Sequence, residues 1–460
     1  MRSRFASLGR VALFFGTLAS LSACSAVGPD FHALRPSPGD VQLPSKVPHF
    51  KPVTLSVFQD PLLRKLVEQA QRTNPTVRQV QAKLLQAELT YSGTRAVQGT
   101  SATGQASLDR QHLAASADTT SSTVAANASW QFDLFGGQRR QLQELQALQH
   151  SQAQTLRAAR IALAAQVASS YVDVRGCERQ TPVYRAQVRI EQKLLALAQD
   201  QLQAGTVADD AVQQARLTLD ASRQQLLSEQ TSCDEDLHTL QNLTGLDAAV
   251  LTKELQAGSA LWPALKAPSS LTALPASVVL SRPDVRAAYE QARAQSAAIG
   301  VQEAQLLPSF TLAGSIGLNN ASLGGTAPWT RTWSFGPTLS IPTLDPRVVS
   351  FAKREAEASF QASQQTWRGT VRAAALDVQN ALSALSQSQA SLNLAGDTLS
   401  AQTRLAHLAR AQQSAGTVPT QTALSAELSR TSSWLNHDVA QQTVLQAWIS
   451  LFKATATSSY

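Results

Sequence analysis

Long stretches of the chain place apolar residues at the three- and four-residue spacing of an amphipathic helix. This pattern predicts helices over about 75–98, 138–203 and 209–243, and a second set over about 283–306, 347–415 and 420–453. A helix over 138–203 would be roughly 100 Å long, which a compact domain does not accommodate. Gly205 and Gly416 interrupt the two longest patterns, so the chain is expected to turn there and return as an antiparallel helix.

Two segments between these helices change to the two-residue alternation of β-strands. In the segment from about 101 to 135, the alternating apolar residues are Val124, Ala126, Ala128, Trp130, Phe132 and Leu134. In the segment from about 308 to 343, they are Phe310, Leu312, Gly314, Ile316 and Leu318, followed by Trp333, Phe335, Pro337, Leu339 and Ile341. Each segment is therefore expected to form a β-hairpin.

The same landmarks recur in the same order, which indicates two structural repeats. Pro75 is echoed by Pro283 after 208 positions, and Trp130 by Trp333 after 203. The Ala-Gly-Thr-Val tetrapeptide at 204–207 returns after 211 positions, at 415–418. In each repeat the short helix and the returning helix together match the long helix in length, so two pieces can stack beside one continuous arm. The predicted repeats cover 61–245 and 276–455, with a connecting equatorial segment at 246–275.

Four strands per chain are too few to close a β-barrel, because small barrels need about eight. Three copies would supply twelve strands, which is an even number as antiparallel closure requires, and twelve helices. The expected fold class is mainly α with a membrane β-barrel. Each repeat contributes a β-hairpin and a long α-helical hairpin, and three copies of the chain would form a 12-stranded β-barrel.

The first residues have the pattern of a secretory signal peptide, with three early arginines followed by an apolar run over 11–19. Residues 21–24, Leu-Ser-Ala-Cys, are similar to a bacterial lipobox. In that interpretation residues 1–23 are removed and Cys24 carries a covalent lipid such as palmitate, which anchors a protein without spanning the bilayer. The alternative is an ordinary signal peptide cut near Ala23, with Cys24 incidental. Residues 24–60 are expected to form a Pro-rich, extended and lipidated leader, and residues 456–460 a disordered tail.

Composition and charge exclude several classes of function. No later stretch holds 18 uncharged apolar residues, so no transmembrane helix is expected, while a spanning β-barrel stays open. The formal charge of +7 is scattered along the chain, so nucleic acid is not an expected partner. The sequence contains neither a phosphate-binding loop nor a nucleophile elbow, so no motif indicates an enzyme. The seven histidines lack metal-ligand spacing, so no metal or other cofactor is expected apart from the lipid on Cys24.

Cys177 and Cys233 lie 28 residues before and 28 residues after Gly205. In an antiparallel hairpin that turns at Gly205, equal distances along the two helices bring both cysteines to the same height. An exported protein is in a compartment that permits oxidation, so a disulfide between them is predicted. The alternative is two free buried thiols, which pack as small apolar groups.

The turns at Gly205 and Gly416 are candidates for a gate at the periplasmic tips, with both glycines as flexible points and Thr417 beside the second. Asp209 and Asp210 begin the helix after the first turn. One interpretation is an N-cap with favourable charge at a helix N-terminus. The other is a threefold acidic ring at the entrance that attracts cations.

Several stretches resemble the TolC-like outer-membrane efflux proteins, and among them the NodT/OprM-like lipoprotein branch. They are residues 24–31 (Cys-Ser-Ala-Val-Gly-Pro-Asp-Phe), 130–136 (Trp-Gln-Phe-Asp-Leu-Phe-Gly), 280–288 (Leu-Ser-Arg-Pro-Asp-Val-Arg-Ala-Ala), 299–310 and 333–337 (Trp-Ser-Phe-Gly-Pro). The resemblance implies a homotrimeric exit duct in the outer membrane of a Gram-negative bacterium, with a 12-stranded β-barrel and a 12-helix periplasmic α-barrel. The partners it implies are a periplasmic adaptor, or membrane fusion protein, and an inner-membrane pump.

The second tip departs from the family pattern. Members often carry an acidic gate there, but residues 415–425 contain no carboxylate, and the nearest tip acids are Asp209 and Asp210. The usual selectivity of that gate therefore does not transfer to this chain.

The expected function is a passive duct, driven by the pump, for multidrug resistance substrates such as drugs, toxic compounds or metal ions. One alternative is a duct for protein secretion. Another is a periplasmic coiled-coil scaffold lipoprotein without a pore, against which the two predicted β-hairpins argue, because a scaffold needs no lipid-facing strands.

Overall fold

The computed structural model describes residues 26–37, 39–40, 53–112, 119–257, 262–265, 275–323, 327–342 and 346–455. The signal peptide at 1–23, the lipidation candidate Cys24 and the tail at 456–460 lie outside these residues. The chain divides into two compact units, each built from segments of both repeats. Unit 1 comprises the described residues up to Arg35 with Lys83–Ala153 and Ala287–Gly369, and unit 2 comprises the remainder.

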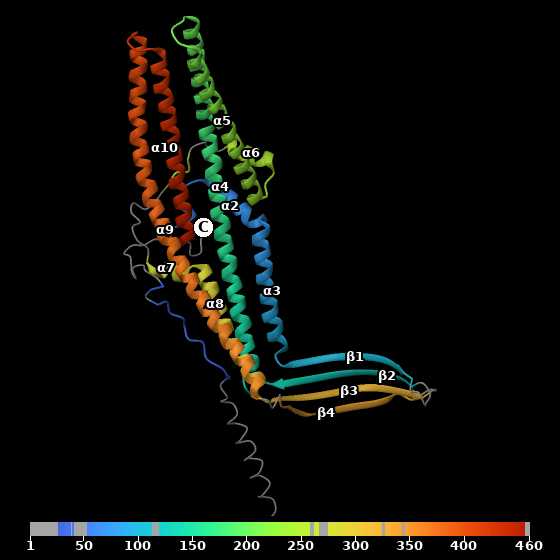
Figure 1. Cartoon of the computed structure of the whole chain (residues 1–460). Coiled ribbons are helices and arrows are strands. Elements are labelled where there is room, and N and C mark those ends of the chain that lie inside the picture. The colour runs from blue at the N-terminus through green and yellow to red at the C-terminus, as the bar shows by residue number, and fades with distance from the viewer. Residues whose placement is uncertain are drawn as a thin grey trace, which may run out of the picture. The chain divides into compact units, whose positions relative to one another are not determined.

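Unit 1 contains one antiparallel sheet of four strands, drawn in chain order in Figure 1. The strands are β1 (Thr100–Gln111), β2 (Thr119–Phe132), β3 (Ser309–Leu323) and β4 (Thr330–Ser340). Strands β1 and β2 form the first expected hairpin, and β3 and β4 the second. The structure adds a pairing between the repeats, because β2 pairs with β3 from Thr119↔Leu323 to Phe132↔Phe310. The two hairpins are therefore one continuous sheet.

The helices follow the same order in both repeats. Repeat one contains α2 (Pro61–Thr73), α3 (Pro75–Val97), α4 (Gly137–Gln203) and α5 (Asp209–Thr244), and the connecting segment contains α6 (Ala248–Ala257). Repeat two contains α7 (Ala276–Ser281), α8 (Pro283–Gln305), α9 (Pro346–Ser414) and α10 (Thr420–Thr455). The expected leader over 24–60 is not wholly extended, because a short 3-10 helix, η2, forms at Leu55–Val57.

Helices α2, α6 and α7 are additions to the elements expected from sequence. Helix α2 has a complete start signal, since Asp60 caps it by accepting hydrogen bonds from the backbone N–H groups of Leu62 (2.8 Å) and Leu63 (3.1 Å). Pro61 occupies the first helical position, where the missing N–H is not needed.

Most residues in the C-terminal half of α10 are buried in the core of unit 2. Its largest buried side chains are Trp448, Phe452, Leu445 and Leu451. Helix α4 contributes the fully buried Ala164, Ala168 and Val172. Small residues let helix backbones approach closely, which explains how a chain poor in aromatic residues builds this core.

Candidate functional site

The four-stranded sheet separates apolar from polar side chains across its two faces. Residues directly opposite each other on antiparallel strands point to the same side. The side that we call the apolar face carries Ala106, Val124, Ala126, Ala128, Trp130, Phe132, Phe310, Leu312, Ile316, Leu318, Trp333, Phe335 and Leu339. Several large side chains of this face are not covered within the chain: Trp333 is 79 % exposed, Phe335 71 % and Ile316 67 %.

The opposite side, which we call the polar face, is rich in hydroxyl and amide groups. One row across all four strands consists of Thr103, Asn127, Ser315 and Ser334. Ser315 and Ser334 share a hydrogen bond of 2.7 Å, and Ser101 and Ser129 share one of 2.9 Å. Such a face is compatible with water, whereas the apolar face is compatible with lipid.

The apolar band has the height of a membrane. From Phe310 to Leu318 the chain advances eight residues along β3, or roughly 27 Å. Outer-membrane strands carry an apolar band of about 25 Å, bounded by aromatic residues. Near the helical end of this band Phe132 lies between Trp130 and Phe310, at ring-centroid distances of 4.1 and 5.3 Å. Among the described residues no helix has the length and hydropathy to cross a membrane.

The turns at the ends of the two helical hairpins in unit 2 have the same geometry. Gly205 has φ +69° and Gly416 has φ +71°, a left-handed conformation that favours glycine. At the first tip the Thr206 N–H donates to the Gln201 carbonyl (2.9 Å), and its hydroxyl donates to the same oxygen. Thr417 repeats both bonds at the second tip. The glycines expected as flexible points therefore sit in well-bonded helix caps.

Asp209 and Asp210 are not N-caps, which corrects one interpretation from the sequence. The N-cap of α5 is Ala208, which makes no side-chain cap, and both acids lie one step later, in the first turn. Asp210 Oδ1 accepts from the Ala211 N–H at 2.7 Å, and Asp209 contacts the Gln213 amide at 3.3 Å. Both side chains are exposed and retain a favourable position for negative charge.

The second tip has its own charged cluster slightly below the turn. Glu427 is only 14 % exposed and lies 2.8 Å from Arg410 of α9, across the hairpin. It also accepts from Arg430 Nε at 3.1 Å. These hydrogen bonds and charges, with His407 nearby, hold the pKa of Glu427 below its usual range. This cluster was not among the features expected from the sequence, although the spacing of Glu427 and Arg430 on one helical face indicates it.

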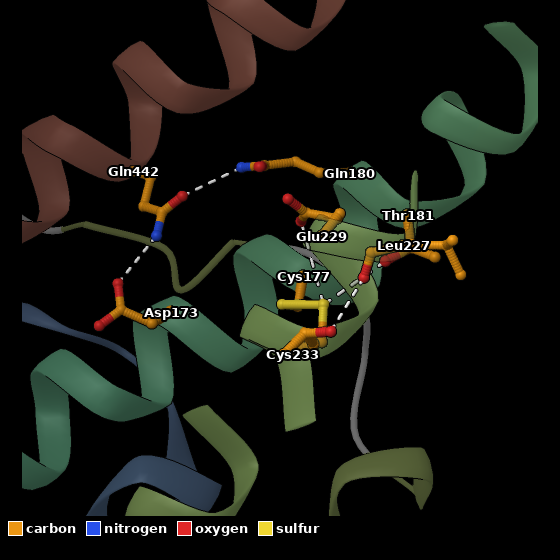
Figure 2. The surroundings of a disulfide bond; sticks show 9 residues. Asp173, Cys177, Gln180, Thr181, Leu227, Glu229, Cys233 and Gln442 are labelled. Atoms are coloured by element: carbon orange, nitrogen blue, oxygen red, sulfur yellow. Dashed lines mark hydrogen bonds between the residues drawn. A yellow bond between two sulfur atoms is a disulfide. The ribbon is translucent and has the colours of Figure 1, made fainter. Parts of the chain in front are cut away.

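A disulfide joins Cys177 of α4 to Cys233 of α5, with a Cα–Cα distance of 5.5 Å. Figure 2 shows the bond between the two helices, with Thr181 and Glu229 beside it. The two sulfurs and a Glu229 oxygen lie within 4.8 Å of one another, but sulfurs held in a disulfide do not act as thiolate ligands for a metal. The bond constrains the first hairpin, and the second hairpin has no cysteine.

Carboxylates gather on α4 and α5 near this disulfide. Burial, with the charges of Asp173 and Glu235, raises the pKa of Asp236 to about 6. Burial also raises the pKa of Asp173, although amide hydrogen bonds oppose that shift. Both amides come from α10: Gln442 and Gln446 each donate to Asp173 Oδ1 at 2.8 Å. Helices α4 and α10 are thus joined by polar contacts as well as by the apolar core (Figure 2).

A buried ion pair fastens the connecting segment to the same two helices. Arg179 of α4 donates from Nε to Asp438 Oδ1 of α10 at 2.7 Å, and Trp262 of the connecting segment donates to the same oxygen at 3.0 Å. The guanidinium carbon lies 5.4 Å from the ring centres of both Trp262 and Trp434. Asp438 Oδ2 is buried without a hydrogen-bond partner among the described residues.

In unit 1, Arg140 holds the chain just after the lipidation candidate. Its side chain is 6 % exposed and donates to the carbonyls of Val27 (2.9 Å) and Gly28 (3.0 Å) and to Asp30 (3.0 Å). The backbone passes close to Gly300, where an added Cβ would lie 2.7 Å from the Val27 carbonyl oxygen. We call these contacts the leader clamp. Val27, three residues after Cys24, is therefore held against α4.

The comparisons with known proteins agree with this geometry. The family model "Outer membrane efflux protein" matches residues 66–246 and 274–457. Nodulation protein T of Rhizobium leguminosarum bv. trifolii is 29% identical over 398 residues, covering 81% of this chain and 80% of the relative. The toluene efflux pump outer membrane protein TtgF of Pseudomonas putida is 30% identical over 305 residues, covering 62% of this chain and 60% of the relative. The solved outer-membrane channel OprN has a TM-score of 0.76 at 24% identity and covers 94% of this chain and 99% of its own.

Proposed function

Because this chain belongs to the outer membrane efflux protein family, we propose that it is the outer-membrane exit duct of a tripartite efflux system. Its relatives are efflux channel proteins and not enzymes. In this proposal small molecules pass through the duct passively, and an inner-membrane pump supplies the free energy through a periplasmic adaptor. The single observation that carries it is the sheet register, which places a membrane-high apolar band on one face and hydroxyl groups on the other.

A homotrimer would close the four-stranded sheet into a barrel and cover the exposed leucines of the helical hairpins. Strands β1 and β4 are open edges of the sheet, and unpaired edges are exposed to non-specific pairing unless another strand covers them. Exposed leucines also line the hairpins of unit 2: Leu217, Leu227, Leu394, Leu405 and Leu408 are all more than half exposed. Three copies would join twelve strands into a closed β-barrel and cover these leucines between neighbouring hairpins.

The lipid on Cys24 would add an anchor at the membrane edge. Three residues span at most about 11 Å, so the leader clamp at residues 27–30 would hold the lipidated cysteine close to the start of α4. Together with the apolar face, this supports a lipid-anchored and spanning location in the outer membrane, with the long hairpins in the periplasm.

The transported class is proposed to be small molecules, since one relative is named for toluene efflux. A duct for protein secretion is the second candidate within transport. The scaffold without a pore is disfavoured, because it would have no need for an exposed apolar band such as Ile316, Trp333 and Phe335.

A pair of neighbouring substitutions tests the proposal. Ile316→Lys puts a charge on the apolar face near the middle of the band, and Ser315→Lys puts the same charge on the polar face. For a membrane-spanning sheet, the first should cost about 2–4 kcal/mol and prevent a heat-modifiable trimer from assembling. The second should assemble and conduct in planar bilayers, with reduced preference for cations. Equal tolerance of both changes, with no conductance from the unaltered protein, would support the scaffold instead.

A further inference from the structure

Arg331 occupies a distinctive position on the apolar face. It pairs with Leu318 in the register, two residues from the Ile316↔Trp333 pair, so its side chain is on the same side of the sheet as Trp333. The next row outward along this face contains Leu108, Ser122 and Asn320, so it is polar on β2 and β3 and keeps one apolar residue on β1. Arg331 therefore lies where the apolar band ends.

The height of Arg331 matches the headgroup region of a bilayer. Eight residues separate it from Leu339 at the helical end of the band, which corresponds to roughly 27 Å. A hydrocarbon layer spanned by outer-membrane strands is about 25 Å thick on this face. A guanidinium at that height has its apolar neighbours in the acyl region and its charge among lipid headgroups.

No described residue satisfies this charge. The Arg331 side chain is exposed and makes no hydrogen bond or ion pair with the described part of the chain. Its neighbours along the face are Leu318, Val124 and Trp333, which offer no acceptor. An arginine in such surroundings is stabilised by an anion. Its planar guanidinium can donate two parallel hydrogen bonds to a phosphate.

We propose that Arg331 binds the phosphate of a membrane lipid whose acyl chains lie along the apolar face. This rests on the proposed function, which places that face in a bilayer. The ligand is a lipid-borne phosphate and not free phosphate, because Trp333, Ile316 and Phe335 supply contact for acyl chains directly next to the charge. Arg331 thereby fixes the depth at which the sheet sits in the membrane.

The full chain extracted from membranes in non-ionic detergent allows a direct test. Native mass spectrometry would count retained phosphatidylglycerol, with phosphatidylcholine as the zwitterionic comparison and inorganic phosphate as a competitor. Arg331→Gln should lower phosphatidylglycerol affinity by roughly tenfold, as expected for loss of a charge-assisted hydrogen bond. Arg331→Lys should keep most of the binding. Arg368→Gln, which removes an exposed arginine of α9 in the same unit, should have no effect.

Moving the positive charge to the other face of the sheet distinguishes a specific lipid site at residue 331 from non-specific electrostatic attraction of anionic lipid. Thr332 is on the polar face, so Arg331→Gln combined with Thr332→Arg keeps the net charge but should not restore binding. Restored binding, unchanged binding by the Gln variant, or complete displacement by an equal concentration of inorganic phosphate would each overturn the proposal. Conductance and heat-modifiable migration of the same preparations are measured separately. A failure of the proposed channel function is therefore distinguished from a failure of lipid binding.

Discussion

Arg179 and Asp438 meet across α4 and α10, with Nη2 2.6 Å from an Oδ1 that belongs to a side chain with no exposed surface. The two residues are 259 positions apart in the sequence and come from different repeats. Trp262 donates to the same oxygen, so one carboxylate ties together two long helices and the segment that connects the repeats. Buried charges of this kind are costly when one partner is removed, because the other remains desolvated.

Asp438→Ala should therefore destabilise the protein by about 3 kcal/mol. Thermal unfolding of the purified protein in detergent would measure the loss. Asp220→Ala is the matched control, because Asp220 and Arg223 form an ion pair whose side chains are 54 % and 52 % exposed. Its removal should change stability by less than about 1 kcal/mol. Similar losses in both variants would show that the buried pair has no special role.

The pKa of Asp236 predicts a pH dependence for the first hairpin. Its folded-state pKa of about 6 lies above the ordinary value near 4, so the folded state binds the proton more tightly. The associated stability is present below the ordinary pKa and is lost as pH rises through about 6. Asp236→Asn should remove this loss of stability, so the thermal midpoint should depend less on pH between acidic and neutral pH. An unchanged slope in Asp236→Asn, or an equal flattening by Asp220→Asn, would contradict the assignment.

The Cys177–Cys233 disulfide should be a major source of stability for the first hairpin. A closed loop of this length, with a sequence separation of 56, corresponds to about 4 kcal/mol in the chain-entropy description. Reductant should lower the thermal midpoint of the unaltered protein but not of the Cys177→Ser, Cys233→Ser variant. Intact mass after alkylation without reduction should show neither cysteine modified. Two alkylated cysteines would disprove the bond.

Asp209 and Asp210 should set cation preference at the first tip if they line the entrance. Replacing both by Asn removes two exposed carboxylates per chain without loss of an N-cap, because Ala208 is the capping residue. Reversal potentials of single channels in a salt gradient should shift toward lower cation selectivity. Asp220→Asn, lower on the same helix, should leave them unchanged. An unaltered reversal potential in the tip variant would remove these acids from the entrance.

Gly300→Ala should loosen the leader clamp. The added methyl group would collide with the Val27 carbonyl and the Arg140 side chain, so residues 27–30 should become more susceptible to limited proteolysis. Gly93→Ala is the control, because nothing lies within 4 Å of an added Cβ there. That change should slightly stabilise α3, by about 0.5–1 kcal/mol. Equal protection of the leader in both variants would show that Gly300 does not hold it.

Local patterns predicted much of this structure. The long helices begin and end close to the expected positions because periodicity and the tip glycines are local signals. The Cys177–Cys233 bond followed from symmetry about Gly205. The N-cap interpretation of Asp209 and Asp210 was wrong by one position, because Ala208 is the capping residue and both acids follow it in the first turn. Helix α2 was missed although Asp60 and Pro61 mark its start.

Relationships between distant segments were harder to infer. Pairing of β2 with β3 joins Trp130 to Leu312 across 182 positions, and nothing in either strand's alternation specifies the partner. The leader clamp depends on Arg140 reaching Val27, 113 positions earlier. Such contacts arise from packing of the whole unit, which periodicity does not describe.

The disulfide also determines how the chain would respond to a cut. A protease that cleaved the exposed turn at Gly205 would act between Cys177 and Cys233, so both fragments would remain joined by the sulfur bridge. Cleavage at Gly416 would leave no such bridge, and the fragment beginning with α10 would be retained only by non-covalent packing. Under non-denaturing conditions both nicked forms could persist, but only the first would still migrate as an intact chain in a denaturing gel without reductant.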